Sequence, residues 1–180
     1  IKHCNSKLNF TEPFNNLFTQ GMVCHESYKD LNGNWLYPTE IEKLNDNSAI
    51  KKTDKSKVII GPPESMSKSK KNTVDPEIMI KKYGADAVRW FILSDSPPER
   101  DVQWSEEGML SSYKFIQKLW TLSENIIEIS IKEHEKNNEE IEIFTNKTIN
   151  KINHALEKFR YNVIIAIFHE IYSFFRKITE

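Results

Sequence analysis

The alternation of hydrophobic and polar positions divides this chain into a first part with short apolar runs and a second part with long helical stripes. Between residues 22 and 60 the apolar runs are short and polar residues separate them, as in strands that bury one face. From about Asp75 onwards, apolar residues recur every three or four positions, which is the period of an amphipathic helix. The pattern therefore predicts a block of strands followed by a block of helices.

In the first block we expect strands at residues 22–28 and 58–60. Asn32-Gly33 lies between apolar residues, and an Asn-Gly pair at such a place is the strongest short-range signal for a β-hairpin. We expect an extended segment at 36–44 to continue this β structure. The stretch 45–57 is rich in lysine and poor in long apolar side chains, so it is predicted to be a surface excursion.

Capping residues set the expected bounds of the helices. Thr11, followed by an acid and Pro13, predicts the start of a helix that carries Phe14, Leu17 and Phe18 on one face and ends at Gly21. Further along, N-cap residues and apolar stripes predict helices at 75–83, 86–93 and 105–130, and a last long helix from 145 to at least 171. The charged stretch 134–140 lacks apolar residues and is predicted to be an exposed linker.

The stretch Ser65–Asn72 stands out because it holds three lysines and three serines in eight residues. It lies between the breaker Gly61-Pro62-Pro63, which follows a strand, and the helix start at Asp75. Ammonium groups, hydroxyls and exposed backbone N–H groups suit a polyphosphate. Composition alone favours an ordinary solvated turn, since charged surface loops are common. Both interpretations stay open at the level of composition.

Composition narrows the class of protein. The chain has 180 residues, of which 38% are hydrophobic and 28% charged, as in a soluble globular protein. A net charge of −1 leaves no global basic field, so any nucleic-acid contact must come from local patches. No apolar run approaches the roughly 20 residues of a membrane span. The first residues lack Met and a signal core, so we expect a segment of a longer chain.

The two cysteines imply no disulfide framework and favour a reducing cytosol. Each cysteine has a histidine neighbour, in His3-Cys4 and in Cys24-His25, and two Cys with two His make a common zinc site. Adjacent ligands in two widely separated pairs do not have the usual ligand spacing, and a free Cys is more often a buried apolar residue. We therefore predict no metal site here.

The order of residues in the lysine stretch resembles the KMSKS signature of the class I aminoacyl-tRNA synthetases. Met66-Ser67-Lys68-Ser69-Lys70 is followed by Asn72 and Asp75-Pro76, and then by Tyr83-Gly84-Ala85-Asp86 and Arg89. Asp101 to Gly108 is similar to the segment that leads into the helical bundle of the leucyl, isoleucyl and valyl types. Upstream, Glu12-Pro13-Phe14 and Gln20-Gly21-Met22-Val23 are most similar to the bacterial leucyl type.

This resemblance implies roles for individual residues. Lys68 matches the signature lysine that contacts ATP phosphates and stabilises the transition state, which makes it the expected catalytic residue. Met66 and Ser67 would line the nucleotide and Ser69 would close the loop. Ser65 stands where the signature has its first lysine and is counted with the ATP-binding residues, while compensation by Lys70 or Lys71 stays open.

The resemblance also implies a fold and an activity. The expected fold class is an α/β catalytic-domain remnant, Rossmann-like with a β-hairpin, followed by an α-helical bundle, with residues 1–100 in the catalytic domain and 101–180 in an incomplete anticodon-binding-type domain. The implied reaction is activation of leucine with ATP and Mg²⁺ and its transfer to tRNA(Leu) by a monomer in the cytoplasm. The family's His-x-Gly-His signature is missing around all five histidines, so we expect the piece alone to be inactive.

Two alternatives remain beside the leucyl type. One is an isoleucyl-, valyl- or methionyl-type synthetase, because the amino-acid pocket lies mostly outside this segment. The other is a non-catalytic helical RNA-binding module, in which the lysine loop would be dispensable. If the chain is part of a synthetase, tRNA phosphates would meet some of the basic residues of the helical half, for which the candidates are Lys114, Lys118, Lys147, Lys151, Lys158, Arg160, Arg176 and Lys177. For each of these, a solvated helix face is an equally good interpretation.

Overall fold

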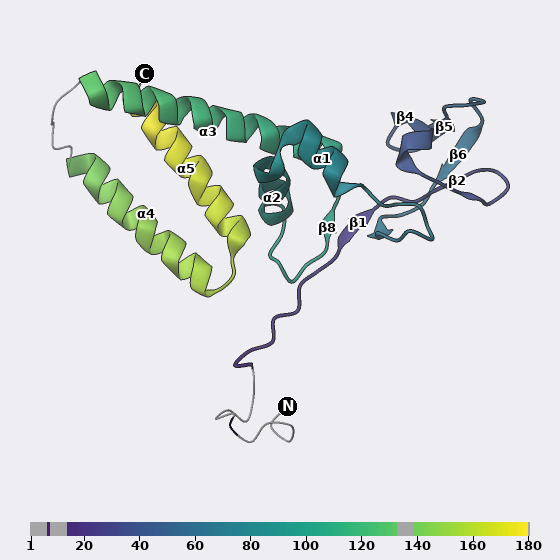
Figure 1. The fold of residues 1–180 in the computed structure, drawn as a ribbon, viewed down its shortest axis with the longest axis horizontal. Helices are drawn as coiled ribbons and strands as arrows, with labels where there is room; N and C mark the ends of the chain where they lie inside the picture. Colours follow the sequence, from purple (N-terminus) through teal and green to yellow (C-terminus); the bar gives the residue numbers. More distant parts are fainter. Residues whose placement is uncertain (1–6, 8–13, 133–138, 180) are drawn as a thin grey trace.

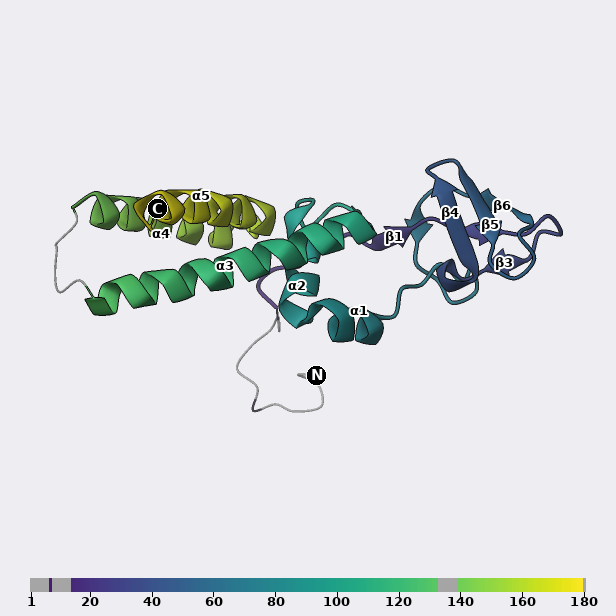
Figure 2. The same cartoon turned by 90° about the horizontal axis from the view of Figure 1, so that it is seen from above.

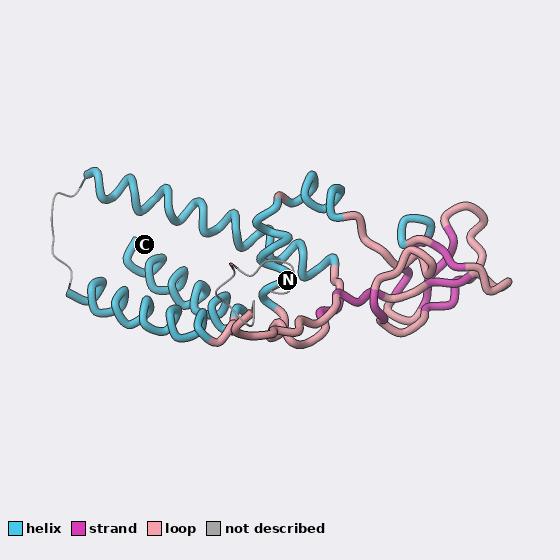
Figure 3. The backbone as a smooth tube through the Cα atoms, turned by 60° about the horizontal axis from the view of Figure 1, so that its bottom comes forward, coloured by secondary structure: helices cyan, strands magenta, loops and turns pink. Residues whose placement is uncertain are grey.

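The structure, a computed structural model, describes residues 7, 14–132 and 139–179. The described chain is elongated, with a small β-rich part at one end and a group of helices at the other (Figure 1). A short sheet lies between these two parts, where the chain passes from one to the other (Figure 3). The predicted order of strands followed by helices is confirmed except for one short strand, β8 (Val102–Gln103), which follows the first two helices.

The β-rich end is a five-stranded sheet in the order β3-β2-β6-β5-β4, in which every neighbouring pair is antiparallel. Its strands are β2 (Tyr28–Lys29), β3 (Trp35–Leu36), β4 (Ile41–Asn45), β5 (Ser48–Lys51) and β6 (Lys57–Ile60), and the short 3₁₀-helix η1 (Pro38–Glu40) precedes β4. One side chain from each strand enters a small core, namely Tyr28, Leu36, Ile41, Ala49 and Val58.

The hairpin predicted at Asn32-Gly33 is present between β2 and β3. Gly33 has a φ of +84°, a conformation that glycine adopts without a steric cost. Asp30 organises the turn, because its Oδ1 accepts hydrogen bonds from the backbone N–H groups of Asn32 at 2.9 Å and Asn34 at 2.8 Å. Such local side-chain bonds are the reason why Asp and Asn favour turns.

The prediction for residues 45–57 was wrong in its middle. Ser48–Lys51 forms β5, which lies between β4 and β6 and has Ala49 buried at its centre. A strand with one small apolar residue carries little period-2 signal in the sequence. Its place in the sheet comes from pairing with two neighbours, which no local pattern records.

The short sheet has the order β7-β1-β8, with β1 (Val23–His25) in the middle. β7 (Glu64–Ser65) pairs with β1 antiparallel, and β8 (Val102–Gln103) pairs with it parallel. The two helices α1 (Pro76–Tyr83) and α2 (Ala85–Ser94) lie in the chain between β7 and β8. They help to close the main core, whose buried residues are Ala87, Phe91, Val102, Trp104 and Met109.

The helix starts at Asp75 and Ser105 are confirmed. The Asp75 side chain accepts a hydrogen bond from the backbone N–H of Glu77 at 2.9 Å, with Pro76 in the first turn, and Gly84 ends α1 at a φ of +83°. Ser105 Oγ accepts from the backbone N–H of Gly108 at 3.1 Å and begins α3 (Glu106–Lys132). The first turns of both helices also carry acids, which the helix dipole favours.

The helix predicted before Gly21 was wrong in the part that the structure describes. Residues 14–20 are not helical, and Phe14 and Leu17 are 75% and 89% exposed. Thr11, the predicted cap, lies outside the described residues. A helix of about eight residues is marginal without a packed face, and here Phe14 and Leu17 find no core.

The single long helix predicted from residue 145 is two helices, α4 (Glu139–Glu157) and α5 (Tyr161–Thr179). The break occurs at Phe159, which has a φ of +54° although it is not a glycine. No Gly or Pro marks the turn, so the apolar period appeared to run through it. The start at Glu139 also contradicts the linker predicted there, since residues 139 and 140 are helical, while 134–138 lie outside the described residues.

The helices form a bundle around α5. α5 packs against α2, α3 and α4, and α4 packs mainly on α5 rather than on α3. Figure 2 shows α3 running the length of this part, with α4 and α5 along one side of it and α1 and α2 near its beginning. An aromatic cluster joins the elements, since the Trp90 ring of α2 lies 5.2 Å from Phe115 and 5.4 Å from Phe168.

Candidate functional site

The lysine loop, residues Ser65–Asn72, leads from the short sheet into α1. Ser65 is the last residue of β7 and pairs with Cys24 of β1. The backbone N–H of Met66 donates to the carbonyl oxygen of Val23 at 3.2 Å, and the Met66 side chain packs against the main core. The loop therefore begins from a fixed strand, with one apolar side chain turned inward.

The middle of the loop is a compact turn. The backbone N–H groups of Lys70 and Lys71 donate to the carbonyl oxygens of Ser67 and Lys68 at 3.2 and 3.3 Å. The hydroxyls of Ser67 and Ser69 lie 2.7 Å apart, within hydrogen-bond distance. Lys71 closes the turn with a φ of +53°, which is a strained conformation for a side chain of its size.

The three lysines of the loop have different surroundings. Lys70 forms an ion pair with Glu64, and the Lys71 ammonium lies over the Tyr37 ring, 5.0 Å from its centre. Lys68 is exposed, and within the described residues its ammonium has no hydrogen bond or ion pair. Of the three cations, Lys68 is thus the one that an incoming anion meets without competition.

The hydrogen bonds around Glu64 keep its carboxylate charged and so maintain its ion pair with Lys70. The hydrogen bond from Lys70, and then one from the Ser27 hydroxyl, hold the pKa of the Glu64 carboxyl below its ordinary value. At neutral pH the carboxylate is charged and neutralises Lys70. The sequence left open whether Lys70 or Lys71 makes up for the missing lysine at Ser65, and this stays a prediction. In the structure both lysines have other partners.

Asn72, which the sequence analysis listed with the signature but gave no role, is the buried residue of the loop. It has no exposed surface, although polar residues surround it in the sequence. Its Oδ1 accepts from the backbone N–H of Ser67 at 2.8 Å, and its Nδ2 lies 3.2 Å from the carbonyl oxygen of His25. An asparagine in a polar turn looks like any other turn residue, so the local pattern gave no sign that it is buried.

A cavity of about 700 Å³ lies between the five-stranded sheet and the beginning of α3, and residues of both regions line it, among them His25, Glu26, Lys43 and Glu106. Burial lowers the pKa of His25, and its Nδ1 has no hydrogen-bond partner. No residue of the lysine loop lines this cavity. Its mixture of acids and bases gives it no clear preference for an anion.

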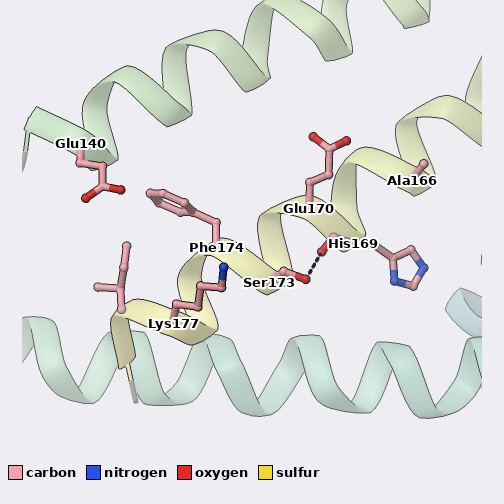
Figure 4. A pocket seen from close by; sticks show the side chains of 8 residues that line it. Glu140, Ala166, His169, Glu170, Ser173, Phe174 and Lys177 are labelled. Atoms are coloured by element: carbon pink, nitrogen blue, oxygen red, sulfur yellow. Dashed lines mark hydrogen bonds between the residues drawn. The ribbon is translucent and has the colours of Figure 1, made fainter.

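A second, shallower pocket lies between α4 and α5. Figure 4 shows Glu140 of α4 facing the α5 residues Glu170, Phe174 and Lys177. Nearby, Lys151 is paired with Glu170 at 3.1 Å. The candidate basic residues for RNA are all exposed and are spread over α3, α4, α5 and the α4–α5 turn. Acids on these helices reduce the local positive charge.

The described residues contain no cluster of three His, Cys, Asp or Glu side chains that could hold a metal ion. Cys24 is a buried free thiol, and His3 and Cys4 lie outside the described part. Among the described helices, none has the length and apolar composition needed to cross a membrane.

Comparisons with known proteins show which family the chain is similar to. A model of the tRNA synthetases class I (I, L, M and V) matches residues 58–105, which include the whole lysine loop. The leucine–tRNA ligase of Azorhizobium caulinodans is 41% identical over 178 residues, and that of Bartonella quintana is 47% identical over 167 residues. These alignments cover 94% and 88% of this chain.

A solved structure has the same fold. It is the ternary complex LeuRS-tRNA-LeuAMS of Agrobacterium radiobacter K84 agnB2, with a TM-score of 0.68 at 22% identity, and the match covers 98% of this chain and 19% of that one. The expected fold class, an α/β part with a β-hairpin followed by an α-helical bundle, is confirmed by this match.

The chain spans only about one fifth of the length of the leucine–tRNA ligases that it matches, 20% and 19% in the two relatives above. Within that fifth, the similarity runs through the strands, the lysine loop and the helices alike, because nearly the whole chain is aligned. The chain is therefore similar, over nearly all of its length, to one segment of the leucine type of the class I tRNA synthetases.

Proposed function

We propose that the full-length protein containing this chain is a leucine–tRNA ligase, which activates leucine with ATP and transfers it to tRNA(Leu). The relatives that carry this name are aligned with nearly all of the chain, which supports the leucine type over the isoleucyl, valyl and methionyl types. The observation that carries the proposal is the exposed Lys68 ammonium, free of partners within the described residues, on a loop anchored at both ends.

The proposed reaction begins with attack of the leucine carboxylate on the α-phosphorus of ATP. A new O–P bond forms, the bond to the bridging oxygen breaks, and pyrophosphate leaves with the charge that develops on it. The Lys68 ammonium stabilises this charge by electrostatic attraction as it develops, so it acts on the transition state. The backbone of Met66 and the hydroxyls of Ser67 and Ser69 line the phosphates, and Ser65 adds a hydroxyl at the edge.

Mg²⁺ is part of the proposal as the ion that accompanies ATP. Since the described residues hold no cluster of metal-ligating side chains, the phosphates and residues beyond the described part would supply its ligands. Mg²⁺ usually keeps several waters and binds through phosphates and one or two carboxylates, which fits this arrangement.

We further propose that residues 1–100 belong to the catalytic domain and that 101–180 belong to an anticodon-binding-type domain that contacts tRNA through phosphates. The protein is proposed to act as a monomer in the cytoplasm, where the free thiol of Cys24 stays reduced. A non-catalytic RNA-binding module remains the rival from another class, and it requires a dispensable lysine loop.

The test is Lys68→Ala in the full-length protein, measured as leucine-dependent pyrophosphate exchange. Loss of one electrostatic contact in the transition state should lower the rate by about 10²-fold or more. Lys81→Ala on α1 removes an exposed lysine outside the loop and is the matched control. A loss of less than about threefold for Lys68→Ala would remove the catalytic assignment, on the same scale. Exchange with isoleucine or valine in place of leucine tests the substrate.

A further inference from the structure

The feature that the proposed reaction leaves unexplained is the complete burial of Asn72. The residues on either side of it are partly exposed, yet Asn72 itself has no accessible surface. A buried carboxamide is costly unless its polar atoms have hydrogen-bond partners. Here both the oxygen and the nitrogen have them.

The partners of Asn72 come from three places in the chain. Nδ2 lies 3.2 Å from the carbonyl oxygen of His25 in β1, and 3.3 and 3.5 Å from those of Glu64 and Ser65 in β7. Oδ1 accepts the backbone N–H of Ser67 at 2.8 Å. All four partners are backbone groups, so a single side chain connects β1, β7 and the start of the turn.

We propose that Asn72 is the positioning residue of the loop, which holds the backbone around Lys68 in place while the Lys68 ammonium stays free. Asn72 binds Ser67 across five positions, so the turn that carries Lys68 is closed at its base. The ordering cost of the turn is then met during folding and not during the reaction, which is how preorganisation accelerates a reaction. This inference rests on the proposed role of Lys68.

The bonding pattern of Asn72 separates a polar anchor from simple space filling. If Asn72 only fills volume, substitution by Asp, which has the same size, should lower the rate of pyrophosphate exchange less than substitution by Ala. If the N–H groups of Asn72 are the anchor, Asp places a carboxylate oxygen against backbone carbonyl oxygens, and it should be at least as damaging as Ala. Both substitutions leave backbone groups without their partner.

The experiment measures leucine-dependent pyrophosphate exchange by the full-length protein with Asn72→Ala and Asn72→Asp. We expect the rate to fall by about 10- to 100-fold for Ala, since a displaced reacting group costs up to about that much. The fall should be equal or larger for Asp, and the KM for leucine should stay unchanged. Asn47→Ala, at an exposed turn of the five-stranded sheet, is the matched control.

A double variant tells positioning from a general structural role. If Asn72 acts through Lys68, Asn72→Ala should cost less than about threefold once Lys68 is already Ala, because residues that act as a unit are not additive. If the double variant instead loses the product of the two single-variant fold-decreases in exchange rate, the proposal is overturned. A large loss for Lys68→Ala with none for either Asn72 variant would overturn this inference alone and leave the proposed function standing.

A measurement without catalysis completes the test. Trypsin can cut after Lys68, Lys70 and Lys71, and its access reports how often the loop opens. Asn72→Ala should raise the rate of cutting in this loop by about tenfold, with unchanged cutting elsewhere. An unchanged rate in the loop would contradict the anchor, and faster cutting throughout the protein would reveal global destabilisation and contradict a local role.

Discussion

Two turns of this molecule have the same unusual backbone conformation and are stabilised in different ways. In the lysine loop, Lys71 has a φ of +53°, and in the turn between α4 and α5, Phe159 has a φ of +54°. Neither residue is a glycine, and both turns are rich in cations. The comparison separates what a turn needs for its shape from what it needs for a function.

The α4–α5 turn is stabilised mainly by neighbours in the sequence. The backbone N–H of Arg160 donates to Ala155 at 2.9 Å and that of Phe159 donates to Leu156 at 3.0 Å, which is the bonding of a Schellman helix end. The Phe159 ring then lies 5.0 Å from the Phe18 ring. Backbone bonds and ring packing together compensate for the strain at Phe159.

The lysine loop is stabilised from a distance. Its anchor, Asn72, reaches His25, which is 47 residues away in the sequence, and all of its partners are backbone groups. The loop therefore keeps the exposed Lys68 ammonium available for a ligand, while Lys70 and Lys71 have partners of their own. The comparison indicates that the loop with a free cation is held by bonds from Asn72 to strands that are remote in the sequence, while the α4–α5 turn relies mainly on backbone bonds between its own residues.

The largest effect that tests this comparison is expected from proline. Proline cannot adopt a positive φ and has no N–H, so Lys71→Pro and Phe159→Pro should each cost about 3 kcal/mol or more locally. We expect Phe159→Pro to remove hydrogen-exchange protection around residues 155–165 while leaving pyrophosphate exchange nearly unchanged. Lys71→Pro should lower the rate of pyrophosphate exchange and leave the hydrogen-exchange protection around residues 155–165 unchanged. If either substitution affects both properties, the two turns are not independent.

Glycine should have a smaller effect, and one that differs between the turns. At both sites glycine relieves a strain of about 1–2 kcal/mol and adds a backbone entropy cost of about 0.5–1 kcal/mol. Phe159→Gly also loses ring contacts with Phe18 and Tyr161, worth about 0.5–1.5 kcal/mol each beyond area. We expect Lys71→Gly to be nearly neutral and Phe159→Gly to be destabilising by hydrogen exchange. Equal effects would show that the rings do not support the turn.

The helical part should respond to pH near neutrality because of His169. Burial lowers the pKa of His169 below its ordinary value, and its ring lies 3.8 Å from the Phe115 ring. The unfolded chain therefore binds the proton more readily, and stability is lost as the pH falls through about 6.5 towards the folded pKa. The pKa of His25 is also lowered, so His25 contributes to the same loss of stability at low pH. The measurement therefore compares the melting temperatures of the parent protein and His169→Gln at pH 7.5 and 5.5. An equal decrease in both proteins would exclude His169 as the cause.

The smallest effect is expected at Glu64, whose ion pair with Lys70 is partly exposed. The pKa of Glu64 is held below its ordinary value, so the pair contributes above about pH 4.3 and is lost as the pH falls through the folded pKa. Glu64→Gln should raise trypsin cutting after Lys70 only slightly at neutral pH, by less than about threefold. A change comparable to that of Asn72→Ala would mean that the ion pair, and not the carboxamide, anchors the loop.

Much of the fold follows from local rules. Asp75 with Pro76 and Gly84 sets the bounds of α1, Ser105 starts α3, and Asn32-Gly33 makes the hairpin, because caps and turn residues satisfy backbone groups that lie a few residues away. The lysine loop was also found from residue order alone, and Lys68 stands exposed within it. These features need no knowledge of the rest of the molecule.

Other features depend on partners that are remote in the sequence. β5 is a strand because β4 and β6 flank it. Residues 14–20 form no helix because no core covers the exposed Phe14 and Leu17. The break between α4 and α5 occurs at Phe159, where the sequence has no glycine. Glu64 binds Lys70 and the Tyr37 ring contacts Lys71, so these two residues decide which lysines have partners. The buried position of Asn72 depends on its hydrogen bond to the His25 carbonyl. By itself the sequence determined which residues could form a phosphate loop. The tertiary structure decided which lysine is free and which side chain holds the loop, because long-range hydrogen bonds and burial leave no periodic signal along the chain.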